Sequence, residues 1–262
     1  MTGKNQLKHQ IDRTIAELCA DIAREPMLHF SEADIQQMLV ERLRQIKGLD
    51  TDVDTARRRA KDSKAVYKTR LVHREYGDGE RGRIDVVVFD PEDAAKIDNA
   101  NLQIGDDYLV PDFAVELGTE KTTNALTHIK NDLEKLERAK TAGYLIYIFR
   151  DTTKSPTGQK RRQQADKSVE RRFKKVVLEE VVKKELPSNI RVLAVLLGSF
   201  RDQSKLQNQC QILDKGTGSF VAKSIDRARK KKAELIEFLM KQLAWEPSEA
   251  STMWCGSQTA GG

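Results

Sequence analysis

Apolar residues recur along this chain with two different periods. Near the N-terminus they follow helical spacing over residues 5–25 and again over residues 31–48. Ser31 and Asp34 stand three residues apart at the start of the second segment, as in a helix capping box, and Gly48 is placed to end that helix. The sequence therefore predicts two N-terminal helices.

Further along the chain the period shortens and strands alternate with helices. Alternating or continuous apolar runs predict strands at residues 66–75, 83–89, 112–117, 144–149, 190–197 and 210–213. Helical spacing returns at residues 124–140, 168–186 and 224–243. This order predicts an α/β domain with a mixed central sheet flanked by helices.

We expect four regions within that single domain. They are an N-terminal helix (1–27), a core (28–150), a basic α/β extension that completes the sheet (151–246) and a disordered tail (247–262).

Composition narrows the class of protein. The charged fraction is 33% and the longest uninterrupted apolar run is Val192–Leu197, which is far shorter than the roughly 20 residues of a membrane span. The first ten residues are polar and do not resemble a secretory signal. Three cysteines without C-x-x-C spacing argue against a disulfide framework. We therefore expect a cytoplasmic protein with no membrane partner.

Three acidic residues lie within otherwise apolar elements. Asp85 lies in the predicted strand at 83–89 and Glu116 in the one at 112–117. Glu32 lies about 20° from Leu39 around the second helix, so we expect it to face inward, whereas Glu41 should face solvent. Buried carboxylates that converge repel one another, and a divalent cation such as Mg²⁺ relieves that repulsion.

Each acid also has a local alternative. Asp85 could pair with Arg83 or Arg81, and Glu116 with Lys121 or with a cation on a neighbouring strand. Glu32 could simply favour the positive end of its own helix. Each acid alone is compatible with a structural role, and only their combination indicates a catalytic site.

Over residues 28–150 the sequence resembles the PD-(D/E)XK nuclease superfamily, which has the restriction-endonuclease-like fold. The segments that carry the resemblance are SEADIQQMLVERL, GRIDVVVFDP, DFAVELGTEK, HIKNDLEKL and YLIYIF. The resemblance implies that Asp85 and Glu116 bind the metal and that Glu32 is an additional catalytic acid. It also implies Mg²⁺-dependent hydrolysis of DNA phosphodiester bonds, with Mn²⁺ as a substitute metal.

One position departs from the family pattern. The family has a lysine two residues after the second acid, where this chain has Gly118. The nearest replacements are Lys121, just beyond the strand, and Lys130 or Lys135 on the following helix. We favour Lys121 as the catalytic lysine, while an ordinary exposed lysine there is the alternative. Lys135 also stands three residues after Asp132, which suggests a local ion pair.

Basic residues are concentrated in the C-terminal half. Residues 154–175 contain nine basic and two acidic residues, and residues 222–232 contain six basic and one acidic residue. Such segments are typical of sequence-independent phosphate contact, although many are solvated helix faces. The residues that we predict to bind nucleic acid are Lys160, Arg161, Arg162, Arg171, Arg172, Lys230, Lys231 and Lys232.

The sequence thus favours a metal-dependent endonuclease that acts on DNA. The alternative is a catalytically inactive DNA-binding or assembly subunit with the same fold, which Gly118 suggests. RNA or modified or branched DNA as substrate, and a homodimer or larger complex, are also left open.

Overall fold

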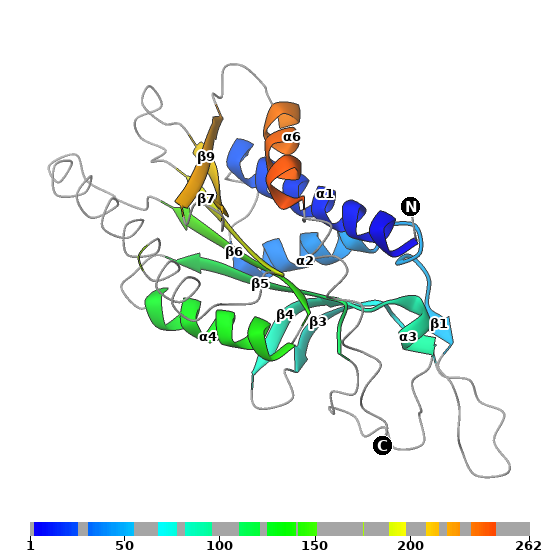
Figure 1. Ribbon diagram of the computed structural model, residues 1–262. Coiled ribbons are helices and arrows are strands. Elements are labelled where there is room, and N and C mark those ends of the chain that lie inside the picture. The colour runs from blue at the N-terminus through cyan, green and yellow to red at the C-terminus, as the bar shows by residue number, and fades with distance from the viewer. Residues whose placement is uncertain are drawn as a thin grey trace, which may run out of the picture.

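The computed structural model in Figure 1 has a mixed sheet between two layers of helices. The structure describes residues 3–25, 31–54, 68–77, 82–95, 110–120, 125–139, 141–150, 175, 189–197, 208–214, 219–225 and 232–244. The predicted α/β class with a mixed central sheet is confirmed. The restriction-endonuclease-like fold stays a prediction.

The main sheet has seven strands in the order β3-β4-β5-β6-β7-β8-β9. The strand bounds are β3 (Val72–Gly77), β4 (Arg83–Val88), β5 (Phe113–Glu120), β6 (Ala142–Arg150), β7 (Ile190–Leu197), β8 (Asn208–Asp214) and β9 (Ser219–Ile225). Strands β5 and β7 run parallel to β6, and the other neighbours are antiparallel. A separate small sheet pairs β1 (Val53–Asp54) with β2 (Lys68–Thr69).

Helices cover both faces of the main sheet. On one face lie α1 (Gly3–Arg24), α2 (Glu32–Leu43) and α6 (Lys232–Leu243), and on the other lies α4 (Ala125–Ala139) (Figure 1). The short α3 (Pro91–Ala95) contacts β1. Helix α2 packs on β3, β4 and β5, and α4 packs on β4, β5 and β6. Strands β4 and β5 therefore lie between α2 and α4.

The core follows from the apolar runs of the sequence. The side chains of Tyr144 through Ile148 on β6 are fully buried, because helices cover both faces of that strand. On α2, Ser31 and Asp34 form the predicted capping box. The helix ends at Leu43, and Gly48 takes a φ of 98° in the turn that follows, a conformation that favours glycine.

Two predicted elements differ from the structure. The strand predicted at 66–75 is divided, because β2 pairs with β1 whereas β3 pairs with β4. The last helix was predicted from residue 224, but Ser224 and Ile225 belong to β9 and pair with β8. The spacing of Ile225 fits a helix as well as a strand, and cross-strand pairing decides between them. The helix predicted at 168–186 lies outside the described residues, apart from Lys175.

Within the described residues, none of the helices is both long and apolar enough to cross a bilayer.

Candidate active site between β4 and β5

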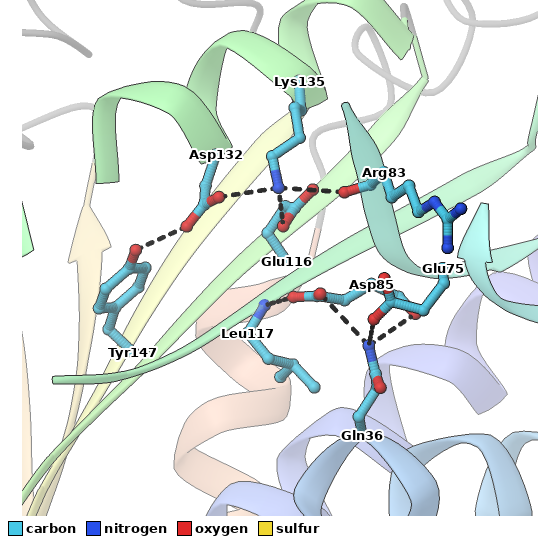
Figure 2. A network of polar contacts seen from close by, with 9 residues as sticks. All are labelled: Gln36, Glu75, Arg83, Asp85, Glu116, Leu117, Asp132, Lys135 and Tyr147. Atoms are coloured by element: carbon cyan, nitrogen blue, oxygen red, sulfur yellow. Dashed lines mark hydrogen bonds and ion pairs between the residues drawn. The ribbon is translucent and has the colours of Figure 1, made fainter. Parts of the chain in front are cut away.

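The backbone ladder between β4 and β5 stops at Asp85 and Glu116. It runs from Val88 opposite Phe113 to Val86 opposite Val115, so the next two residues in register are Asp85 and Glu116. At that point the Leu117 N–H donates to Asp85 Oδ2 at 2.7 Å (Figure 2). A side-chain carboxylate thus takes the place of a backbone acceptor, and two acids lie beside each other where the ladder ends.

Asp85 is also bound from the α2 side of the sheet. Gln36 Nε2 lies 3.2 Å from Asp85 Oδ1, 3.1 Å from the Asp85 carbonyl oxygen and 2.9 Å from Glu75 Oε1. The amide orientation of Gln36 is fixed because its Oε1 accepts from Arg74 at 2.6 and 3.0 Å. Glu75 itself has a φ of 51°, which is rare for a residue other than glycine. The Asp85 carboxylate is therefore held by a buried amide and a backbone N–H.

Glu116 points toward α4, as Figure 2 shows. Its side chain is 1% exposed, and its Oε2 accepts from Lys135 Nζ at 2.8 Å. Its other oxygen, Oε1, has no hydrogen-bond partner among the described residues. Because an unpaired carboxylate oxygen is costly to bury, Oε1 is an acceptor that the described residues leave open to a further donor or a cation.

The acids perturb one another. Burial raises the pKa of Asp85 to about 6. The Leu117 N–H and the Lys135 charge lower this pKa, whereas the Glu32 and Asp132 carboxylates raise it. Burial also raises the pKa of Glu116, and the charges of Asp85 and Asp132 raise it further. Although burial alone lowers the pKa of an ammonium, Glu116 and Asp132 raise the pKa of Lys135. The carboxyl groups therefore crowd one another at this site, which favours their protonated forms, and a bound cation would favour the ionised forms.

Glu32 is exposed and does not face inward with the apolar row as predicted. It is the first residue of α2, where the helix begins at the edge of the packed layer. Its Oε2 nevertheless lies 3.2 Å from the Thr119 backbone N and 3.4 Å from the Thr119 hydroxyl. Glu32 thus reaches β5 three residues beyond Glu116, and its charge acts on Asp85. Glu41 is exposed, as predicted.

The cation at Glu116 comes from the helix that follows β5. Lys135 contacts Glu116 Oε2, whereas Lys121, the residue favoured from the sequence, lies outside the described residues. Lys130 is exposed on the same helix. Of the two of these lysines that the structure describes, Lys135 is therefore the one that contacts Glu116.

One of the predicted nucleic-acid-binding residues has a partner within the protein. Lys232 Nζ lies 2.7 Å from Asp21 Oδ1, and Arg42 binds the other oxygen of Asp21 at 2.9 Å. Lys232 thus joins α6 to α1 and, through Asp21, to α2. The other residues predicted to bind nucleic acid lie outside the described residues: Lys160, Arg161, Arg162, Arg171, Arg172, Lys230 and Lys231.

Sequence reasoning missed four side chains of the site. Gln36 and Glu75 look like ordinary polar residues, and Tyr147 looks like part of an apolar strand. Asp132 was noted only as a local partner of Lys135, but it also accepts from the Tyr147 hydroxyl at 2.6 Å. The signal that could have found Tyr147 is Gly118, because a glycine inside a strand often marks a close approach by another group.

The donors at the site suit a hard cation. Among the described residues, no three His, Cys, Asp or Glu side chains form a metal-binding group. Mg²⁺, however, is usually held by one or two carboxylates with water and phosphate oxygens completing the shell. Asp85 and Glu116 are two carboxylates of the kind that such a site uses, and Glu116 Oε1 has no partner among the described residues.

No protein-family model, curated protein or solved structure matches the chain.

Proposed function

We propose that the chain is a Mg²⁺-dependent nuclease that hydrolyses phosphodiester bonds in DNA, with Asp85 and Glu116 as metal ligands. The observation that carries the proposal is the Glu116 carboxylate, which is 1% exposed, contacts a lysine through one oxygen and leaves the other without a partner among the described residues. A purely structural acid in this position would be expected to have both oxygens satisfied.

The chemistry of the site fits phosphodiester hydrolysis. A divalent cation bound there would neutralise charge on the scissile phosphate and lower the pKa of a bound water. Lys135 is the ammonium at the acid pair, and a cation in that position stabilises negative charge that develops on a phosphate. Glu32 reaches the same end of β5 and can contribute a further carboxylate.

DNA is the substrate class that the charge distribution favours. The chain has a net charge of +6, and residues 154–175 alone carry nine basic side chains against two acidic ones. Basic segments of this kind bind the phosphate backbone without reading the base sequence. We therefore expect cleavage without strong sequence preference.

The test is cleavage of plasmid and linear DNA with Mg²⁺ or Mn²⁺. Wild type should cut, EDTA should stop the reaction, and Asp85→Asn and Glu116→Gln should be inactive. The matched control is Glu41→Gln, an exposed carboxylate on α2 that should cut like wild type. Equal activity in wild type and Glu116→Gln would contradict the proposal. Parallel assays with RNA and branched DNA define the substrate.

A second function, a DNA-binding subunit without catalysis, is favoured by one observation. Both oxygens of Asp85 already accept hydrogen bonds, from the Leu117 N–H and from Gln36. This function predicts salt-sensitive DNA binding that EDTA does not change, with no cleavage of any substrate. Calorimetric titration with Mg²⁺ separates the two functions, because only the nuclease should bind the ion through Asp85.

A further inference from the structure

Position 118 is filled by the ring of a neighbouring tyrosine. A Cβ atom at Gly118 would lie 2.5 Å from Cε1 and Cζ of Tyr147 on β6, closer than real Cβ contacts allow. Tyr147 is fully buried, so its ring has little freedom to withdraw. Any side chain at position 118, a lysine included, would have to displace that ring.

The same tyrosine is linked to the lysine that the site does have. The Tyr147 hydroxyl donates to Asp132 Oδ2 at 2.6 Å, and Asp132 Oδ1 lies 2.9 Å from Lys135 Nζ (Figure 2). Lys135 Nζ also donates to Glu116 Oε2 at 2.8 Å and to the Arg83 carbonyl at 3.1 Å. An ammonium has three N–H donors, so these three acceptors use all of them.

These contacts form a chain from β6 through α4 to β5. The series of contacts begins at Tyr147, whose ring fills the space beside Gly118, and ends at the Glu116 carboxylate. A flexible lysine side chain loses considerable rotamer freedom when it is fixed. The hydrogen-bonded Asp132 offsets part of that loss, because its two oxygens are held between Tyr147 and Lys135.

We propose that Asp132 and Tyr147 are positioning residues that hold the Lys135 ammonium against Glu116, and that the Tyr147 ring is the reason why position 118 is glycine. The catalytic use of Lys135 rests on the proposed nuclease function, whereas its positioning does not. In this chain the ammonium of the site is thus supplied by the helix after β5.

The first experiment measures positioning without any substrate. In ¹H–¹⁵N spectra of lysine ammonium groups, an Nζ whose three N–H groups are all hydrogen-bonded, as in the half-buried Lys135, exchanges slowly and gives a visible signal. We expect such a signal in wild type, assigned by its loss in Lys135→Met. It should disappear in Asp132→Asn, weaken in Tyr147→Phe and persist in Glu137→Gln, an exposed carboxylate on the same helix. A Lys135 signal that is unchanged in both Asp132→Asn and Tyr147→Phe would overturn the proposal.

The second experiment uses cleavage kinetics. Asp132→Asn should lower kcat about 100-fold and Tyr147→Phe about 10-fold, with KM within about twofold, because a misplaced ammonium affects the transition state and not DNA binding. A loss confined to KM would contradict a positioning role.

The third experiment moves the lysine. Lys135→Met combined with Gly118→Lys and Tyr147→Ala should regain at least about a tenth of the wild-type rate, whereas Lys135→Met with Gly118→Lys alone should not. Recovery in the variant that keeps Tyr147 would refute the idea that its ring excludes a side chain. If wild type cuts no DNA while the ammonium signals behave as expected, the nuclease function fails and the positioning role stands.

Discussion

Strand β6 supplies a buried tyrosine hydroxyl to an aspartate on each face of the sheet, and the two resulting networks differ in one respect. On the α1 face, Tyr144 donates to Asp12 Oδ1 at 2.6 Å and Lys8 binds Asp12 Oδ2 at 2.6 Å. On the α4 face, Tyr147 and Lys135 bind the two oxygens of Asp132. The networks are alike up to this point.

The difference is Glu116. At Asp12, which is 3% exposed, both carboxylate oxygens have a partner. The Asp132 network continues through Lys135 to the buried carboxylate of Glu116, one oxygen of which has no partner in the part of the chain that the structure describes. A buried polar group without a partner is costly, so the Glu116 oxygen would gain more from a bound cation than either oxygen of Asp12. The α1 face thus fits a structural role, and the α4 face is where the proposed metal site would lie.

The largest expected effect is on stability at Asp12. Asp12→Ala removes a buried carboxylate that is the partner of the half-buried Lys8 ammonium and of the buried Tyr144 hydroxyl, so we expect a loss of about 3–5 kcal/mol in the free energy of unfolding. Glu116→Gln, at an equally buried carboxylate, should change that free energy by less than about 1 kcal/mol, because it removes a charge that burial disfavours. Denaturant unfolding at pH 7 measures both. Equal losses in the two variants would erase the distinction between the networks.

The next effect is on DNA cleavage, which should depend on Glu116 and hardly at all on Asp12, the reverse of the order expected for stability. Glu116→Gln should lower metal-stimulated DNA cleavage at least about a thousandfold, equivalent to about 4 kcal/mol of transition-state stabilisation. Asp12→Asn, assayed on its folded fraction, should stay within about threefold of wild type. Initial rates at saturating Mg²⁺ provide the measurement. A rate loss in Asp12→Asn as large as that in Glu116→Gln would show that the α1 face also takes part in catalysis.

A smaller effect should appear in the pH dependence of stability. The pKa of Asp85 is raised from 3.8 to about 6, so the folded protein holds this proton more tightly than the unfolded chain does. The contribution of Asp85 is therefore most favourable below about pH 4 and is lost as pH rises from about 4 to about 6. The loss is at most about 3 kcal/mol.

Asp85→Asn isolates this contribution. The free energy of unfolding of the variant, relative to wild type, should rise between pH 4 and pH 6 and then level off. Denaturant unfolding at pH 4, 5, 6 and 7 measures the difference, and Glu41→Gln is the exposed control. A flat difference across this range would mean that Asp85 titrates normally. Mg²⁺ should recover part of the lost stability in wild type and not in Asp85→Asn.

The α/β class with its mixed sheet, and the unusual places of Asp85 and Glu116 within it, could be predicted because they depend on local patterns. The strands of the core appear as apolar runs, and the helix start at Ser31 appears as a capping box. Asp85 and Glu116 stand out because a charged residue inside an apolar strand needs a reason to be there. Strand β9 was missed because Ile225 fits both periods, and only the register with β8 resolves them.

The supporting residues of the site could not be predicted because their roles depend on three-dimensional proximity. Gln36 contacts Asp85 across 49 positions of sequence, and Lys135 contacts the Arg83 carbonyl across 52. Tyr147 has the strand propensity of its apolar neighbours, and its hydroxyl gains a partner only when α4 packs on β6. The spacing of apolar residues along the sequence carries no information on which polar side chains will form hydrogen bonds in the folded protein.

The smallest expected effect is on stability and concerns Gln36, a fully hydrogen-bonded side chain that contacts Asp85 of the candidate site. Its amide is fully used, with Nε2 bound to Asp85 and Glu75 and Oε1 bound to Arg74. Gln36→Ala should lower the free energy of unfolding by about 1–2 kcal/mol, because hydrogen bonds to charged groups are lost while Arg74 and Glu75 can return to water. Its neighbour Gln37 is exposed and also contacts Arg74, so Gln37→Ala should lose less than about 0.5 kcal/mol. If the two variants are equally stable, Asp85 is held by the Leu117 N–H alone, and the α2 side of the sheet contributes packing without orienting the acid.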